Sequence, residues 1–189
     1  MPDIPPVKLR TARFILKQPS AENAADLFLI YGNRETMRFM QAPPAASVAE
    51  CRELILEWNR RFCDGSSFRW GVFPSDDSNR MIGTAALHYW SRKNRRIELG
   101  ADLNPDHQGQ GIATEVTAAL IELAFNALKV NRIELRCHPG NTASVVIAGK
   151  LGFRFEGILR QYVMVPGKGM VDEAVYSLLA DDRQPVSDR

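Results

Sequence analysis

Asn104-Pro-Asp-His-Gln-Gly-Gln-Gly-Ile-Ala-Thr-Glu-Val-Thr-Ala-Ala-Leu120 is the stretch that decides the fold, because it joins a strand to a long helix through a loop rich in glycine. Glycines at 109 and 111 let the backbone turn tightly and approach a ligand closely. The first N–H groups of the helix lack partners within it and lie at the positive end of its dipole. This combination is typical of a site for a pyrophosphate.

Two familiar phosphate loops do not fit this stretch. A Walker loop requires a lysine after its last glycine, and Ile112 stands there. A dinucleotide-binding loop requires a third glycine where Thr114 stands, and it belongs near the start of a domain. Taken alone, the loop is also compatible with a glycine-rich connection that binds nothing.

Outward from the loop, hydrophobic periodicity and turn residues predict a mixed α/β chain. Glu35 to Met40 extends the first helix or adds a short turn. The unit at 97–138 should be a right-handed parallel strand–helix–strand in an otherwise antiparallel sheet. The expected strands are 13–17, 68–73, 81–90, 95–103, 132–138, 153–165 and 171–179, and the expected helices are 21–32, 47–63, 112–128 and 141–151.

Composition places the chain among ordinary globular proteins. It has 189 residues, 45% of them hydrophobic, and a formal net charge of only +2, which does not favour a nucleic-acid partner. No apolar run is long enough to cross a membrane. Cys51 and Cys63 fall on one predicted helix, too far apart for a disulfide, and no metal-ligand spacing occurs. We therefore expect a reduced, cytoplasmic protein without a metal.

Several motifs resemble those of the GCN5-related N-acetyltransferase (GNAT) superfamily, in its RimJ/RimL-type branch. Gln108-x-x-Gly111-x-Ala113 is similar to the loop with which that superfamily holds the pyrophosphate of acetyl-CoA. The later segment Asn141-Thr-Ala-Ser144, Leu151-Gly-Phe153 and Glu156-Gly157 is also similar, as is the opening Leu9-Arg-Thr-Ala-Arg13.

The resemblance implies a GNAT fold over residues 8–180, as a single domain with loose termini at 1–7 and 181–189. The sheet should have about seven strands, mostly antiparallel with a splayed parallel pair in the middle, and about four helices should accompany it. Acetyl-CoA is then the expected cosubstrate. Its pyrophosphate should meet the loop formed by Gln108, Gly109, Gln110, Gly111, Ile112, Ala113 and Thr114.

The resemblance also assigns the pantetheine arm to main-chain groups of Ala101 and Leu103. A main-chain N–H near Leu103 would act as an oxyanion donor. Asn141 either caps the next helix or also binds the pantetheine. Ser144 follows one turn later and is the expected proton donor to the leaving thiolate, unless its hydroxyl only satisfies the helix start.

Glu98 is the residue that we expect to act as general base, since an attacking ammonium must lose a proton. It would otherwise pair with Arg96 or Arg136. The ribosomal-protein branch is thought to use a glutamate where this chain has Val163. Cys137 is expected to be inert core rather than an acyl-accepting nucleophile.

The sequence thus predicts an N-acetyltransferase acting on a primary amine, either a peptide or protein N-terminus or a small amino compound. The alternative is a non-catalytic CoA-binding regulatory module on the same fold. A homodimer is compatible with the resemblance, and the acceptor is not identified.

Overall fold

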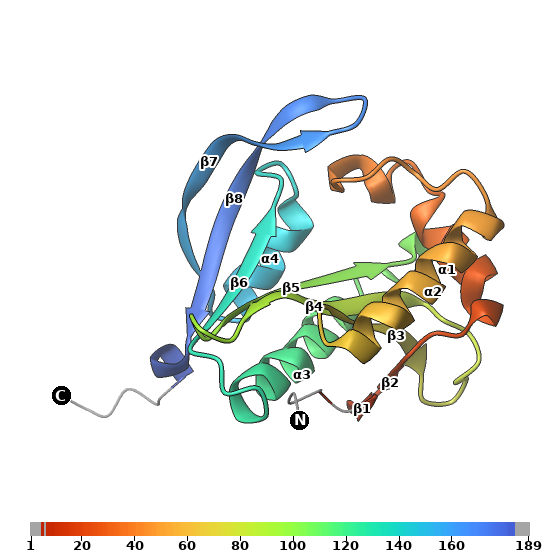
Figure 1. The fold of residues 1–189 in the computed structure, drawn as a ribbon, viewed down its shortest axis with the longest axis horizontal. Coiled ribbons are helices and arrows are strands. Elements are labelled where there is room, and N and C mark those ends of the chain that lie inside the picture. The colour runs from red at the N-terminus through yellow and green to blue at the C-terminus, as the bar shows by residue number, and fades with distance from the viewer. Residues whose placement is uncertain (1–4, 6, 184–189) are drawn as a thin grey trace.

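The computed structural model describes residue 5 and residues 7–183. Among these residues the chain forms a mixed α/β structure around an eight-stranded sheet, in the order β1-β2-β3-β4-β5-β6-β8-β7 (Figure 1). The strands are β1 (Lys8–Arg10), β2 (Phe14–Lys17), β3 (Phe68–Pro74), β4 (Gly83–Ser91), β5 (Arg96–Leu103), β6 (Arg132–Cys137), β7 (Arg154–Val165) and β8 (Gly169–Leu179). The helices are α1 (Ala24–Tyr31), α2 (Val48–Asp64), α3 (Ile112–Asn126) and α4 (Thr142–Lys150).

The predicted parallel unit is confirmed. β5 and β6 run parallel, with α3 between them in the chain, and the other neighbouring strands pair antiparallel. The β5–β6 pairing covers three positions, from Arg96↔Arg132 to Glu98↔Glu134, and then ends. Beyond Glu98 the two strands diverge, which is the expected splay (Figure 1).

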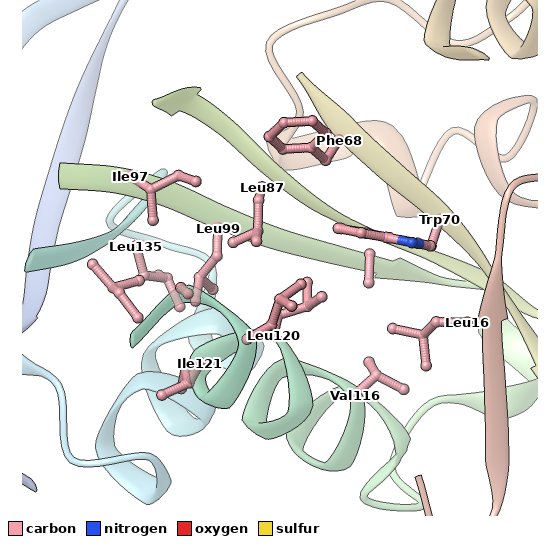
Figure 2. Packing of buried hydrophobic residues seen from close by; sticks show 14 of the residues in the cluster. Leu16, Phe68, Trp70, Leu87, Ile97, Leu99, Val116, Leu120, Ile121 and Leu135 are labelled. Atoms are coloured by element: carbon pink, nitrogen blue, oxygen red, sulfur yellow. The ribbon is translucent and has the colours of Figure 1, made fainter. Parts of the chain in front are cut away.

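The main core lies between the sheet and α3. Val116 and Leu120 fall at helical spacing on α3 and face the sheet, where Leu99 and Trp70 belong to the same cluster, and Ile121 lies on another side of the helix (Figure 2). Trp70 and Leu120 are fully buried. This packing fixes the start of α3, and therefore the glycine loop, against the end of β5.

A second buried cluster fixes α1 and α2 on the other side of β3. Leu27 and Ile30 of α1 and Ile55 of α2 pack there with Phe73 of β3 and with Met81. Because side chains alternate along a strand, Arg69 lies on the same face of β3 as Phe73, opposite Trp70. The face of the sheet that carries Arg69 is therefore the one that α1 and α2 cover.

Short segments differ from the expectation. β1 is an eighth strand, three residues long, and it is too short to show an alternating pattern in the sequence. The first predicted helix divides into a 3-10 turn at Ala21–Asn23 and α1, and a second 3-10 turn at Thr36–Phe39 follows. Residues 181–183, assigned above to a loose end, complete a 3-10 turn (Ala180–Arg183), and the rest of that end lies outside the described residues, as do residues 1–4 and 6 of the other.

None of the described helices is both long and apolar enough to cross a membrane.

Candidate functional site

A cleft of about 760 Å³ opens where β5 and β6 diverge; we call it the central cleft. Its walls include the second half of β5, the end of β6 with the start of α4, the β7–β8 hairpin and the segment 38–41 that follows α1, and side chains of α2, β3 and β4 also line it. Glu98, Ala101, Asn141 and Ser144 are the predicted site residues that line it. Leu103 and residues 108–114 do not line the cleft; they lie at the end of β5 and at the start of α3.

The glycine loop has the conformation that a phosphate site requires. Gly109 and Gly111 both have a φ of +74°, a region that residues with a Cβ rarely occupy. A Cβ on Gly109 would meet nothing within 4 Å, so the surface beside it is open. Gly111 is the N-cap of α3, and Gln108 and Gln110 beside it are exposed. The loop therefore presents main-chain groups to solvent at the positive end of α3.

Arg13 holds the glycine loop in place. Its Nη1 and Nη2 both donate to the carbonyl of Gln110 at 3.3 Å, and its Nε donates to Glu115 of α3 at 2.7 Å. Thr11 donates a further bond to Glu115 at 2.6 Å. These contacts fix the loop and the first turn of α3 to the N-terminal strands, so a ligand would meet a preformed loop.

Ile112, Ala113 and Thr114 begin α3 rather than the open loop. Ile112 is buried in the main core, whereas Ala113 and Thr114 are half-buried. Their contribution to a phosphate site would therefore come from main-chain N–H groups in the first turn.

Main-chain groups of Ala101 and Leu103 point toward the gap between β5 and β6. Asn104 N donates a hydrogen bond of 2.9 Å to Ile82 O, and this bond shows which residues of β5 turn their main-chain groups toward β4. Because that ladder alternates, Leu103 and Ala101 turn their N–H and C=O groups away from β4. The carbonyl of Leu103 accepts a bond from Gln108 Nε2 at 3.2 Å, which links the strand end to the glycine loop.

Asn141 and Ser144 occupy the opposite wall of the central cleft. Asn141 is the N-cap of α4, and its Oδ1 accepts the Ser144 N–H at 3.3 Å. The capping role predicted for Asn141 is thus confirmed. Ser144 is half-buried and lines the cleft.

Glu98 lies across the cleft with both carboxylate oxygens engaged. Oε1 is 3.0 Å from His88 Nε2 on β4, and Oε2 is 3.4 Å from Arg136 Nε on β6. The pairing with Arg136 is one of the two alternatives noted above, and the contact with His88 was not expected. The side chain of Glu98 is 15% exposed.

Glu173 on β8 is the functional candidate that sequence reasoning missed. Its side chain is 5% exposed and lines the cleft. Oε1 accepts a bond of 2.6 Å from Gln41 Nε2, and Oε2 is 3.6 Å from Arg136 Nη1. Burial, together with the charge of Glu98, raises the pKa of Glu173. The signal in the sequence was an acid at 173, between Val171 and Val175 on one face of the predicted strand.

Arg136 has its shortest contacts with a third carboxylate, Glu134. Its Nη2 and Nε donate to Glu134 Oε2 at 2.8 and 3.1 Å. Burial works against ionisation of Glu134, but hydrogen bonds from Arg132 and Arg136 outweigh it and lower its pKa. Glu134 therefore stays ionised and neutralises much of the positive charge of Arg136.

A buried polar cluster forms the wall of the cleft below α1 and α2. Asp102 Oδ2 accepts from Tyr31 OH at 2.9 Å and from Arg69 Nη1 at 3.2 Å. The Arg69 guanidinium also lies over the Trp58 ring, 4.8 Å from its centroid. Burial raises the pKa of Tyr31, so the phenol stays protonated. The cluster holds β5 to the helices on this face.

Cys137 lines the cleft instead of lying only in the core. Burial and the nearby charge of Glu173 raise the pKa of its thiol to about 11. The thiol is therefore protonated near neutral pH, and a protonated thiol is a poor nucleophile. This agrees with the prediction that Cys137 is inert.

Comparison with known proteins identifies relatives over almost the whole chain. Residues 13–154 match the family described as acetyltransferase (GNAT) domain. The uncharacterized N-acetyltransferase p20 of Bacillus licheniformis is 32% identical over 171 residues, which are 90% of this chain and 95% of the relative. The [ribosomal protein uS5]-alanine N-acetyltransferase of Escherichia coli is 25% identical over 97% of this chain and 96% of its own.

A solved GCN5-related N-acetyltransferase from Brucella melitensis superposes with a TM-score of 0.82 at 25% identity. The match covers 95% of this chain and 82% of that one.

Proposed function

The chain belongs to the GNAT acetyltransferase family, whose acyl donor is acetyl-CoA, and we propose that it transfers the acetyl group directly to a primary amine in the central cleft. The observation that carries this proposal is the divergence of β5 and β6 after three paired positions. That divergence leaves the main-chain groups of Ala101 turned toward a cleft that Ser144 of α4, Glu98 of β5 and Glu173 of β8 also line.

The residues of the glycine loop, of β5 and of the start of α4 fit acetyl-CoA as the acyl donor. We propose that the loop Gln108–Thr114 receives the pyrophosphate, since its glycines already have left-handed backbone and Arg13 holds it in place. The pantetheine arm would then pass between β5 and β6 and bind main-chain groups of Ala101 and Leu103, with the side chain of Asn141 beside it.

The chemistry required of the chain is limited. The amine nitrogen forms a bond to the thioester carbonyl carbon, the carbon–sulfur bond breaks, and the electron pair leaves with sulfur. A carboxylate of the cleft takes a proton from the amine, and the Ser144 hydroxyl donates one to the thiolate and takes up another from solvent. Glu98 is the proton acceptor that the sequence predicts, and Glu173 is another carboxylate that lines the cleft.

We propose that the acceptor is an α-amine, at the end of a flexible peptide or on a small amino compound. The unperturbed pKa of an α-amine is about 7.7–8.0, so an appreciable fraction is neutral near pH 7.5. A lysine amine, with a pKa near 10.4, is almost wholly protonated there. The named activity of the Escherichia coli relative, on the alanine of ribosomal protein uS5, supports the same class.

A competition assay tests the acceptor class. Acetyl-CoA and the protein are incubated with equal amounts of alanine- and serine-initiated peptides, an Nα-blocked lysine peptide and spermidine, and products are quantified by mass spectrometry. We expect the free-N-terminus peptides to be acetylated fastest. Faster acetylation of spermidine or of the blocked lysine peptide would refute the α-amine proposal. Binding of acetyl-CoA without any product would favour the non-catalytic module.

A further inference from the structure

Glu173 lies at the junction of two cavities. A second pocket of about 450 Å³, the side pocket, adjoins the central cleft. The residues that line both cavities are Gln41, Tyr89, Glu98, Arg136, Val163 and Glu173. An acceptor in the side pocket and a donor in the central cleft would therefore meet at the carboxylates of Glu98 and Glu173.

The two carboxylates are not equally neutralised. Glu98 has His88 at 3.0 Å and Arg136 at 3.4 Å. Glu173 has one short hydrogen bond, from the uncharged amide of Gln41 at 2.6 Å, and the guanidinium of Arg136 is 3.6 Å away. Since the short bonds of Arg136 go to Glu134, Glu173 is the carboxylate with the weaker cationic partner.

The surroundings of Glu173 favour uptake of a proton. Four neighbouring elements face it, with Glu98 on β5, Arg136 and Cys137 on β6, Gln41 before α2 and Tyr162 on β7 across the side pocket. The negative charge of Glu98 and the burial of the site raise the pKa of Glu173, and Arg136 only partly opposes them. A general base is most effective when its pKa lies near the working pH.

We propose that Glu173 removes the proton from the acceptor amine and that Glu98 is a positioning residue, which holds Arg136 and His88. This assignment rests on the proposed acetyl transfer and names the base for it. The proton passes from the amine nitrogen to a carboxylate oxygen of Glu173 as the carbon–nitrogen bond forms, and it leaves through the side pocket to solvent. Gln41 fixes the other oxygen.

The test compares kcat/KM of the wild type, Glu173→Gln and Glu98→Gln between pH 5.5 and 9.5, with acetyl-CoA and an alanine-initiated peptide. We expect Glu173→Gln to lose about 10²-fold or more near pH 7 and less above the amine pKa of about 8. Glu98→Gln should lose less and keep the fall in rate at acidic pH that the wild type shows. Glu53→Gln, on the exposed side of α2 and outside both cavities, is the matched control with unchanged kinetics.

Chemical rescue separates a base from a structural residue. Formate added to Glu173→Gly should restore part of the activity, because the small carboxylate occupies the space left, and it should not restore Glu98→Gly. If Glu173→Gln does not fold, Glu173→Asp replaces it in the comparison. That variant should be slower than the wild type and should keep the fall in rate at acidic pH. If the wild type is active and Glu173→Gln keeps full activity across the pH range, Glu173 is not the base, and the proposed acetyl transfer still stands. A wild type that acetylates no amine would overturn the proposed function as well.

Discussion

Replacing Asp102 by alanine should destabilise the protein strongly, because this aspartate is the carboxylate partner of a buried cation. Arg69 and Asp102 have side chains only 20% and 14% exposed, and Asp102 Oδ2 accepts bonds from Tyr31, Arg69 and Thr84. Removing one partner of a buried ion pair leaves the other charge uncompensated, at a cost of about 3–5 kcal/mol. For a chain of this size, 1 kcal/mol shifts Tm by about 2–4 °C, so Tm should fall by about 6–20 °C.

Urea unfolding followed by circular dichroism measures this cost as a change in the free energy of unfolding. Asp76→Ala, in the exposed turn between β3 and β4, is the control and should stay within about 0.5 kcal/mol of the wild type. Tyr31→Phe removes two hydrogen bonds, the one that the hydroxyl donates to Asp102 and the one that it accepts from Arg69, and should cost about 1.5–3 kcal/mol. If Asp102→Ala loses less than about 1 kcal/mol, the cluster does not hold β5 to α1 and α2 as described.

Further predictions concern the donor, the leaving group, the thiol and the buried acid. Gly111→Val places a β-branched residue at a φ of +74° and should abolish the rise in Tm that acetyl-CoA causes. Gly149→Val should keep that rise, because a Cβ added at this glycine of α4 meets nothing within 4 Å. Ser144→Ala should lower kcat by about 10²-fold or less and change the KM for acetyl-CoA little, as initial rates will show. Cys137→Ala should retain transfer activity, because the thiol stays protonated; loss of transfer with normal folding would argue for an acyl-enzyme. Since the pKa of Glu173 is raised in the fold, its contribution to stability falls as pH rises from about 4.3 toward that raised value, so the Tm of Glu173→Gln relative to the wild type should increase between pH 4 and pH 8.

The sequence was most informative where local patterns determine structure. The apolar spacing of Val116 and Leu120 predicted α3, and Asn141 predicted the start of α4, because helix periodicity and caps act over a few residues. The parallel pairing of β5 with β6 followed from the strand–helix–strand unit around the glycine loop, whereas the position of β8 between β6 and β7 did not. The short strand β1 was missed, since three residues carry no period and its pairing with β2 is set by tertiary context.

The half of the candidate site that we propose for the cofactor could be expected from sequence, because it is one loop and one helix start. The acceptor half could not, because it depends on contacts between distant segments. Gln41 and Glu173 are 132 residues apart and share a hydrogen bond of 2.6 Å. Glu98 was found as a candidate base, yet its partner His88 depends on the register between β4 and β5, which no local pattern specifies.

A single-turnover experiment tests the central claim most directly. The protein is first saturated with acetyl-CoA, then mixed with an alanine-initiated peptide, and peptide, CoA and protein are followed by mass spectrometry. Direct transfer predicts that the acetyl group moves to the peptide α-amine as CoA is released, with no acetylated protein at any time. An unchanged peptide, or an acetyl group found first on Cys137, would contradict the account.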